Sequence, residues 1–193
     1  MLKRELRKTY SSKRKLLSDG ECALLNQGIY ANFFGLVDLT AIRTLHMYLP
    51  IPKNNEPDTW QILDRIRREY AHIKITLPKT DVTTYTIENI YFEGLHQLKA
   101  NAWDIPEPQQ GVPTPVETID MALVPLLAVD KQGHRAGYGK GFYDRFLKQC
   151  RPDCKKVGLS FFEPVDVIDD VDAFDVPLTH CVTPSKLHIF SII

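Results

Sequence analysis

"MALVPLLAVD", residues 121–130, is an almost continuous run of apolar side chains. Such a run is typical of a strand that is buried on both faces, and strands of this kind lie inside parallel sheets that are covered by helices. The segments 42–50, 72–78 and 155–162 are also rich in apolar residues, and we expect each of them to contain a strand. The sequence therefore predicts a parallel sheet built around residues 121–130.

Helices are predicted in the segments that surround these strands. Residues 2–17 have the pattern of a basic helix, and a second helix is expected after it, because "SDGE" at 18–21 has the spacing of a capping box. Residues 58–70 are predicted to form another helix, with Asp58 or Thr59 as its N-cap.

The rest of the chain contributes shorter elements. Residues 82–92 alternate well enough for a strand, and two short final strands are expected in 180–184 and 186–190. Residues 101–117 are rich in proline and are expected to form an extended connection with no element of its own. Strands that alternate with helices predict an α/β fold in which a central, mostly parallel sheet is flanked by helices, as a single domain over residues 1–193.

The composition excludes several classes of protein. The chain has 193 residues, of which 44% are hydrophobic and 25% are charged, as in an ordinary globular protein. It has no apolar run long enough to span a membrane and no pattern of a secretory signal, so we expect a cytoplasmic protein without a membrane partner. The four cysteines lack the spacing of a disulfide framework or a zinc site, and the six histidines form no metal-binding pattern.

The net charge is zero, but positive charge is concentrated near the N-terminus. Residues 1–17 contain seven lysines and arginines against one acidic residue, Glu5. A basic segment of this size favours a local anion site, whereas a protein that coats a nucleic acid needs a basic excess over its whole docking face. The alternative is a non-catalytic nucleotide- or RNA-binding module that uses this basic helix.

A glycine-rich segment, "RAGYGKGFYDRF" at 135–146, follows the apolar run and leads into a helix expected over 142–150. In open α/β sheets, ligands collect beyond the carboxyl ends of strands, where glycines let a phosphate approach backbone N–H groups. The spacing excludes a Walker loop and a dinucleotide fingerprint, because Gly141 stands where the first needs Ser or Thr and Phe142 where the second needs glycine. Asp144 either neutralises the helix dipole or reaches a phosphate-bound magnesium ion. From the residues alone, a phosphate site and a flexible turn are about equally supported.

The segment "GYGKGFYDR", residues 137–145, resembles the signature of the 5-formyltetrahydrofolate cyclo-ligase family, whose members are also called methenyltetrahydrofolate synthetases. Four further segments agree with this family in order and spacing: "KRELRKTY" (3–10), "YLPIPKNNEPDTWQIL" (48–63), "NAWDIPEP" (101–108) and "FDVPLTHCVTP" (174–184). The resemblance implies a Rossmann-like fold and an ATP- and magnesium-dependent cyclisation of 5-formyltetrahydrofolate to 5,10-methenyltetrahydrofolate, with release of ADP and phosphate. We expect a monomer that acts on this small molecule and has no nucleic-acid partner.

By the same resemblance, residues of the first helix and of the glycine-rich segment bind ATP. They are Lys3, Arg4, Arg7, Arg135, Gly137, Tyr138, Gly139, Lys140, Gly141, Phe142 and Tyr143. Lys140, Arg135 and Tyr143 are the members expected to act in catalysis, and Lys140 is expected to stabilise the phosphoryl group during its transfer.

The remaining matches concern the folate and the metal. The residues that match the substrate site are Leu49, Glu56, Trp103, Tyr138 and Phe142. The carboxylate of Glu56 is expected to accept paired hydrogen bonds from the ring amide and amino group of the pterin. Asp144 and Asp175 match the magnesium ligands of the family.

Overall fold

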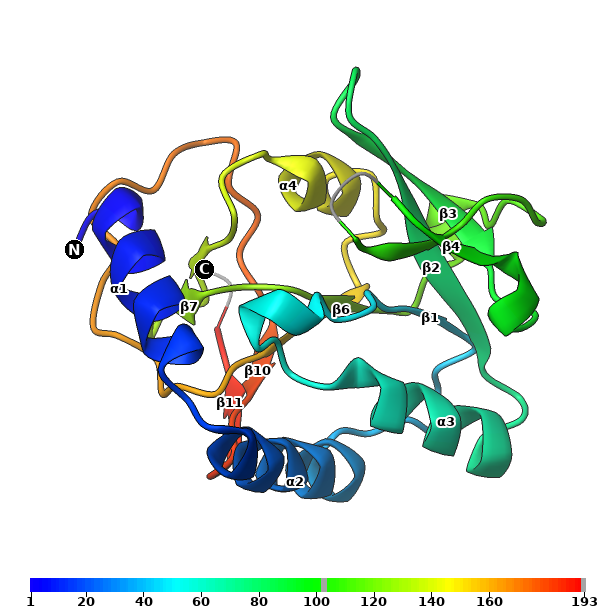
Figure 1. Ribbon diagram of the computed structural model, residues 1–193. Helices are drawn as coiled ribbons and strands as arrows, with labels where there is room; N and C mark the ends of the chain where they lie inside the picture. Colours follow the sequence, from blue (N-terminus) through cyan, green and yellow to red (C-terminus); the bar gives the residue numbers. More distant parts are fainter. Residues whose placement is uncertain (102–103, 192–193) are drawn as a thin grey trace.

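The computed structural model describes residues 1–101 and 104–191, with a mixed seven-stranded sheet at its centre (Figure 1). The strand order is β11-β10-β9-β6-β1-β2-β3. These strands are β1 (Thr44–His46), β2 (Lys74–Asp81), β3 (Thr86–Tyr91), β6 (Met121–Val124), β9 (Lys155–Leu159), β10 (His180–Val182) and β11 (Leu187–Ile189). The five inner strands are parallel, and the edge strands β3 and β11 run antiparallel to their neighbours. The predicted α/β fold with a mostly parallel sheet is confirmed.

Helices lie on both faces of this sheet. The α-helices are α1 (Lys3–Lys15), α2 (Asp19–Leu36), α3 (Thr59–Glu69) and α4 (Phe142–Leu147), and the 3-10 helices are η1 (Pro52–Asn54), η2 (Leu95–Gln97) and η3 (Val116–Thr118). Figure 1 shows α2 and α3 below the sheet, α4 above it and α1 to one side. Of the helices in the described part of the chain, none combines the length and the apolar character needed to cross a membrane.

Strand β6 is buried on both faces, as its apolar sequence predicts. Leu123 packs in one core cluster with Phe33 of α2. Ala122 and Val124 pack in a second cluster with Phe146 of α4. Because successive side chains of a strand point to opposite faces, this one strand joins the two halves of the core.

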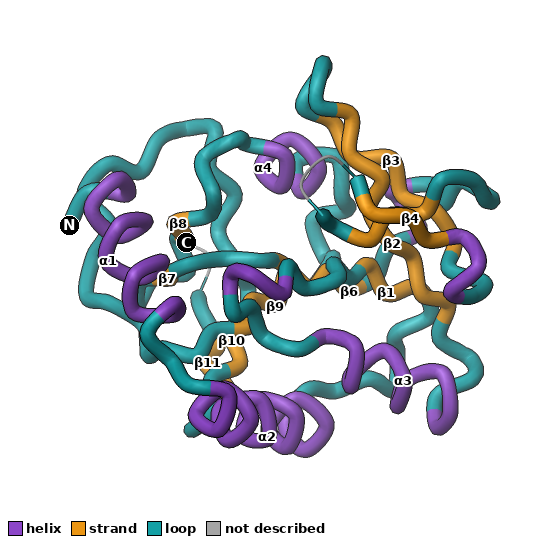
Figure 2. Tube along the Cα trace, viewed as in Figure 1, coloured by secondary structure: helices purple, strands orange, loops and turns teal. Residues whose placement is uncertain are grey.

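The apolar run 121–130 does not form one continuous strand. β6 stops before Pro125, which has no N–H to donate to a neighbouring strand. The chain then makes a small hairpin beside α1, in which β7 (Ala128–Val129) pairs with β8 (Arg135–Ala136) (Figure 2). The glycine stretch, residues 137–141, therefore leaves from this hairpin and not directly from the buried strand.

The proline-rich segment 101–117 contains elements that its sequence does not reveal. Its β5 (Pro106–Pro108) pairs antiparallel with β4 (Leu98–Ala100) in a separate two-stranded sheet, and η3 follows. The expectation that this segment forms no element is wrong. Prolines are tolerated in an edge strand, where a missing N–H need not cost a ladder hydrogen bond.

Two helices begin at predicted capping residues. The Ser18 hydroxyl accepts a hydrogen bond from the backbone N–H of Glu21 at 3.3 Å, and the backbone N–H of Ser18 donates to the Glu21 carboxylate at 2.8 Å. Of the two residues proposed for the start of α3, Asp58 is the N-cap, and its side chain accepts from the backbone N–H of Trp60 at 2.9 Å.

The strand order creates a branch point between β1 and β6. β1 pairs with β2 on one side and with β6 on the other, so the connections that leave β1 and β6 diverge. In open α/β sheets, ligands bind in the crevice between such diverging loops, at the carboxyl ends of the strands. In this chain the two loops are residues 47–58 and 125–141.

Two glycines of α2 offer a matched test of how this helix packs. A Cβ atom on Gly28 would lie 2.7 Å from the carbonyl oxygen of Pro184, whereas a Cβ on Gly35 would meet nothing within 4 Å. We predict that Gly28→Ala lowers the free energy of unfolding by about 1–3 kcal/mol, because the backbone must shift to relieve the contact. Gly35→Ala should leave it unchanged or raise it by up to about 1 kcal/mol, since alanine favours a helix. Urea denaturation measures both, and equal effects would contradict this packing.

Candidate active site

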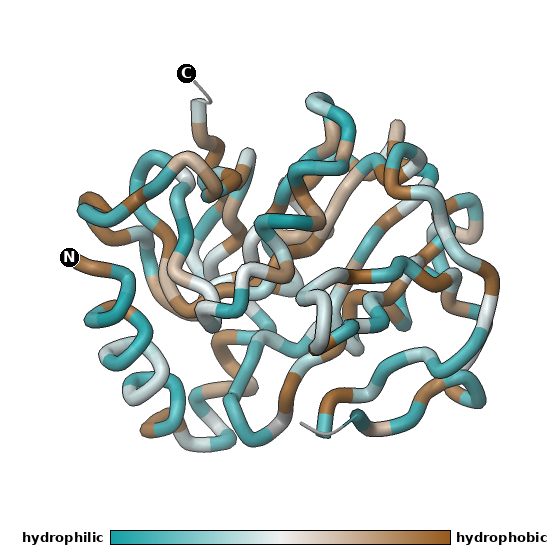
Figure 3. The backbone as a smooth tube through the Cα atoms, turned by 90° about the horizontal axis from the view of Figure 1, so that it is seen from above, coloured by the Kyte–Doolittle hydropathy of each residue, from teal (hydrophilic) through white to brown (hydrophobic). Residues whose placement is uncertain are grey.

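A cleft of about 1020 Å³ opens at the carboxyl ends of β1 and β6, at the branch point of the sheet. Its walls come mainly from the loop after β1, from the glycine stretch with the start of α4, and from residues 170–175. Residues 105–107 and two residues of α1, Lys3 and Arg7, also line it. Figure 3 shows the first helix, next to the N-terminus, as a largely hydrophilic segment.

α1 turns part of its basic face towards the cleft. Lys3 is only 7% exposed, and its ammonium group forms an ion pair with Asp175. Arg7, one helical turn later, donates from Nε to the carbonyl oxygen of Gly137 at 2.9 Å. Arg4 is exposed, and the described lining of the cleft does not include it. The structure therefore brings Lys3 and Arg7 to the cleft but not Arg4.

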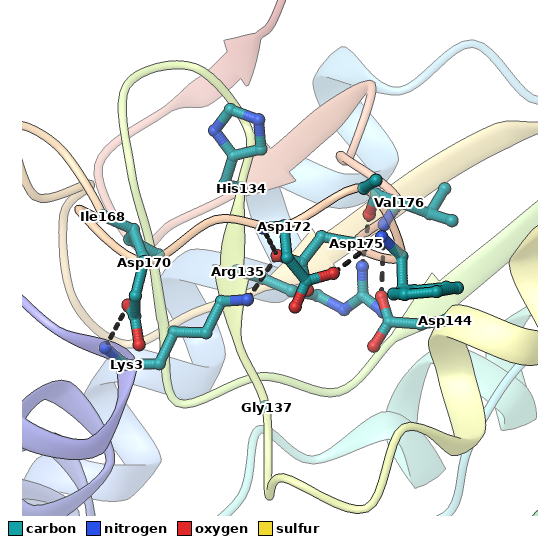
Figure 4. Close-up of polar contacts among 12 residues, drawn as sticks. Lys3, His134, Arg135, Gly137, Asp144, Ile168, Asp170, Asp172, Asp175 and Val176 are labelled. Atoms are coloured by element: carbon teal, nitrogen blue, oxygen red, sulfur yellow. Dashed lines mark hydrogen bonds and ion pairs between the residues drawn. The ribbon is translucent and has the colours of Figure 1, made fainter.

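A second ion pair lies close to the first (Figure 4). Nη2 of Arg135 lies 2.7 Å from Oδ1 of Asp144. Nη1 of Arg135 donates to the carbonyl oxygen of Val176, and the backbone N–H of Val176 donates to Oδ1 of Asp144 at 3.2 Å. Burial lowers the pKa of Arg135, and the neighbouring Asp144 carboxylate opposes this shift. The two pairs, with the hydrogen bonds to Val176, thus connect α1, β8 and α4 to the segment before β10.

The acidic segment 170–175 anchors the start of α1. The backbone N–H of Lys3 donates to Oδ1 of Asp170 at 2.7 Å. Burial alone would raise the pKa of Asp175, but the hydrogen bonds it accepts from Lys3 and from the backbone N–H of Asp172 lower it. Asp175 is therefore a carboxylate at neutral pH, held beside a buried ammonium group.

Two of the three glycines in the stretch are needed for conformation and for space, whereas a Cβ on Gly137 would meet nothing within 4 Å. Gly139 and Gly141 have φ values of +87° and +72°, in the left-handed region that favours glycine. A Cβ on Gly139 would lie 3.2 Å from Cζ of Arg7. Lys140 between them is exposed, and its carbonyl oxygen accepts a hydrogen bond from Nη1 of Arg145 at 3.1 Å. The stretch therefore leaves the Lys140 side chain free to follow a ligand.

Glu56 is a buried carboxylate in the loop after β1. It is 8% exposed, its Oε2 accepts from the backbone N–H of Ile51 at 2.7 Å, and its Oε1 accepts from the hydroxyl of Tyr138. Burial raises the pKa of Glu56, and these hydrogen bonds oppose the shift. The glycine stretch and the Glu56 loop are thus linked by a direct hydrogen bond.

Arg14 extends this link to α1, and the sequence analysis assigned it no role. Its Nη2 donates to the hydroxyl of Tyr138, and its Nη1 donates to the carbonyl oxygen of Leu126 at 3.3 Å. The side-chain amide of Asn55 donates to the carbonyl oxygen of Arg14 at 2.9 Å. The spacing of Lys3, Arg7 and Arg14, which repeats close to whole helical turns, is the signal that could have identified it.

His46, at the end of β1, is a second residue that the sequence analysis missed. It is fully buried, and its Nδ1 lies 2.8 Å from Oδ1 of Asn89 in β3. Its Nε2 lies 3.2 Å from the hydroxyl oxygen of Tyr143 in α4. Burial lowers the pKa of His46 to about 3, and the hydrogen bond with Asn89 opposes this shift only in part. The imidazole is therefore neutral at physiological pH.

The acidic residues fit a magnesium ion that arrives with phosphate. In residues 1–101 and 104–191, no three Asp, Glu, His or Cys side chains form a group that could hold a metal on their own. Magnesium is commonly held by one or two carboxylates together with phosphate oxygens and water, so such a cage is not required. Asp144 and Asp175 face the same cleft. The hydrogen bonds from Arg135 and from the backbone N–H of Val176 both go to Oδ1 of Asp144 and do not involve Oδ2.

Most other residues expected at the site also line the cleft. They are Leu49, Gly137, Tyr138, Gly139, Lys140, Gly141, Phe142 and Tyr143. Trp103, which was expected at the folate, lies outside the described residues. The cleft thus brings together parts of the chain that lie far apart in sequence.

Comparison with known proteins gives a consistent result. Residues 1–184 match the profile of the 5-formyltetrahydrofolate cyclo-ligase family. The 5-formyltetrahydrofolate cyclo-ligase of Mycoplasma pneumoniae is 31% identical over 180 residues, which cover 92% of this chain and 96% of that protein. The structure of Aquifex aeolicus 5,10-methenyltetrahydrofolate synthetase superposes with a TM-score of 0.83 at 30% identity, over 100% of this chain and 95% of the other. That of a 5,10-methenyltetrahydrofolate synthetase from Mycoplasma pneumoniae gives 0.76 at 27% identity, over 95% and 99%.

We predict that acid destabilises the protein through His46. Between the folded pKa of about 3 and the ordinary value of 6.5, the unfolded chain binds a proton that the folded chain does not. Stability therefore falls as the pH drops below about 6.5, and from pH 7.5 to pH 5 this group should cost about 2 kcal/mol. His46→Gln should lose about 2 kcal/mol less than the wild type over that interval in urea unfolding. The same pH dependence in both proteins would contradict a buried neutral histidine.

Proposed function

The chain belongs to the 5-formyltetrahydrofolate cyclo-ligase family of enzymes, and we propose that it converts 5-formyltetrahydrofolate to 5,10-methenyltetrahydrofolate with ATP and magnesium. The main support for this proposal is the arrangement of charged side chains in the cleft. A single cleft has cationic side chains of α1 and the glycine stretch on one wall and the buried carboxylate of Glu56 on another, and Tyr138 connects the two.

The proposed reaction requires both the cationic wall and the wall that contains Glu56. A formamide oxygen is a poor leaving group, and transfer of the γ-phosphoryl group of ATP to that oxygen makes it a good one. The neighbouring secondary amine then attacks the formyl carbon, the carbon–oxygen bond breaks, and phosphate and the amine proton leave. ATP and folate must therefore lie side by side, with the formyl oxygen at the γ-phosphate.

The cationic wall suits the triphosphate. Phosphoryl transfer depends on positioning and on neutralising charge, with little covalent work for the protein. Lys3, Arg7 and Arg135 would hold the phosphates, together with the backbone of residues 137–141. Lys140, whose side chain is exposed at the cleft, would follow the phosphoryl group to the formyl oxygen. Arg135 would assist at the phosphoryl group, and Tyr143 would assist at the attacking amine.

The other wall suits the flat ring of the folate. The Glu56 carboxylate can accept paired hydrogen bonds from the ring amide and amino group, in place of the bond from Tyr138. Leu49, Tyr138 and Phe142 would contact the ring, and all three line the cleft. A carboxylate that is buried before the ligand arrives needs no further desolvation when it binds.

Magnesium would be held by Asp144 and Asp175 together with phosphate oxygens. Each carboxylate is paired with a cation in the structure, Asp144 with Arg135 and Asp175 with Lys3. The ion would supply charge neutralisation of the phosphates during transfer. Arg135 and Lys3 would then be free to bind phosphate in place of the carboxylates.

The alternative of an RNA-binding module has less support. Arg4, Lys8, Lys13 and Lys15 of the basic helix are exposed, but Lys3 and Arg14 are buried. The glycine stretch and the buried Glu56 carboxylate have no role in such a module.

The described cysteines are all free thiols, which suits the cytoplasmic location that we propose. A monomer remains our expectation for the active form.

The experiment that tests the proposed function is an absorbance assay. Purified protein mixed with 5-formyltetrahydrofolate, ATP and magnesium should produce the near-ultraviolet band of the conjugated methenyl product. Omitting ATP or adding a chelator should abolish the rise. No rise in the complete mixture would refute the proposal.

We predict that Lys140→Ala lowers kcat by about 100- to 1000-fold, because it removes a charge that matters most as the phosphoryl group moves. The KM for folate should change little. Lys131→Ala, at an exposed lysine in the β7–β8 hairpin, is the matched control and should keep the wild-type rate. Steady-state kinetics with both variants decide this, and a normal kcat in Lys140→Ala would remove the residue from the mechanism.

Glu56→Gln should act mainly on folate binding. The amide keeps the shape of the side chain but loses the charge that strengthens its hydrogen bonds, so we predict folate binding weakened by roughly 10- to 100-fold with ATP binding retained. Isothermal titration with each ligand separates the two effects. Glu88→Gln, an exposed site on β3, is the control. Equal folate affinity in Glu56→Gln and the wild type would place the pterin elsewhere.

A further inference from the structure

The buried residue Asn89 determines which nitrogen of His46 carries the proton. The amide oxygen of Asn89 can only accept, and it lies 2.8 Å from Nδ1 of His46, so Nδ1 must be the protonated nitrogen. His46 is 0% exposed and neutral, so its second nitrogen, Nε2, carries no proton. Nε2 can therefore only accept a hydrogen bond.

This tautomer determines the direction of the next hydrogen bond. The Tyr143 hydroxyl lies 3.2 Å from Nε2 of His46, and only the hydroxyl has a proton to share, so Tyr143 donates to His46. The ring of Tyr143 is also fixed by edge-to-face contacts, with centroids 5.7 Å from His46 and 6.0 Å from Phe146. The only proton of the hydroxyl is thus used inside the protein.

The oxygen of Tyr143 therefore offers lone pairs to any ligand in the cleft. Tyr143 is half-buried and lines the cleft together with Glu56, Arg135 and Glu107. A ligand group that contacts this oxygen must bring its own proton. An oxygen acceptor, such as a phosphate or a formyl oxygen, would be repelled there.

We propose that His46 is a positioning residue, which with Asn89 holds Tyr143 as a hydrogen-bond acceptor for an N–H group of the substrate. This inference rests on the proposed function, in which the group that fits is the N–H of the attacking secondary amine. An accepted N–H limits rotation of that amine and keeps its lone pair available to the formyl carbon. Tyr143 and His46 orient the amine and exchange no proton with it.

The burial of His46 and Asn89 argues against a purely structural role for this network. A leucine or phenylalanine at position 46 would fill the same apolar surroundings without the cost of burying an imidazole. The sequence instead supplies His46, Asn89 and Tyr143 from β1, β3 and α4, with a hydrogen bond at each step. These hydrogen bonds end at the cleft, where they make the hydroxyl oxygen of Tyr143 a hydrogen-bond acceptor.

The test is a double-mutant cycle on His46 and Tyr143. If His46 acts only through the hydroxyl, His46→Leu and Tyr143→Phe should each lower kcat by roughly tenfold, with the KM for ATP unchanged. The double variant should be no slower than Tyr143→Phe alone. His46→Gln, whose amide oxygen can accept from the hydroxyl, should restore part of the loss, and His72→Leu at an exposed histidine should have no effect. Independent, additive losses would overturn the proposal.

A second measurement does not depend on activity or on a variant that folds. ¹⁵N NMR of the histidine rings in the wild-type protein should show His46 as the neutral Nδ1–H tautomer from pH 5 to 8. An Nε2–H tautomer would overturn the inference. A wild-type protein that forms no methenyl product, but shows the Nδ1–H tautomer, would instead refute the proposed function alone.

Discussion

Three buried cations determine how the walls of the cleft come together, because each of them needs a partner inside the protein. Lys3, Arg14 and Arg135 are 7%, 3% and 7% exposed. A charge removed from water without a partner costs several kcal/mol, so the chain must bring oxygen atoms to each of them. Asp175 and Tyr138 supply these oxygens to Lys3 and Arg14 from segments that are distant in sequence, and Asp144 of α4 supplies one to Arg135 of β8.

The pairs Lys3–Asp175 and Arg135–Asp144 would let one cleft accept both an anionic phosphate and a magnesium cation. In the proposed function, phosphate oxygens replace the two carboxylates as partners of Lys3 and Arg135. A magnesium ion replaces the two cations as the partner of Asp144 and Asp175. Each of these four charges keeps an opposite charge beside it, so binding exchanges ion pairs and leaves none of the four unpaired. On the other wall, the same reasoning applies to Glu56, which exchanges the Tyr138 hydroxyl for donors of the pterin.

Much of the fold could be predicted because single segments carry local signals. The apolar composition of 121–124 predicts a strand buried on both faces, and the capping residues Ser18 and Asp58 predict where two helices begin. The break at Pro125 and the strand at 106–108 could not be predicted, because they depend on which neighbouring backbone groups need a hydrogen bond. That information is present only in the folded sheet.

The site was predictable where its residues form a contiguous motif and not where they act through neighbours. The glycine stretch and the spacing of Lys3 and Arg7 are visible in the sequence. Arg14 was missed because it is one of seven basic residues in the N-terminal segment, and His46 because a lone histidine in a strand is more often structural. Their roles depend on Tyr138 and Tyr143, which reach them only through tertiary contacts.

The central claim is that this cleft activates the formyl oxygen of a folate with the γ-phosphoryl group of ATP. The most direct measurement follows that oxygen. 5-Formyltetrahydrofolate labelled with ¹⁸O in the formyl group is converted with unlabelled ATP, and the released phosphate is analysed by mass spectrometry. The account predicts that the label appears in inorganic phosphate, one atom for each methenyl product formed. Product formed with unlabelled phosphate would contradict it.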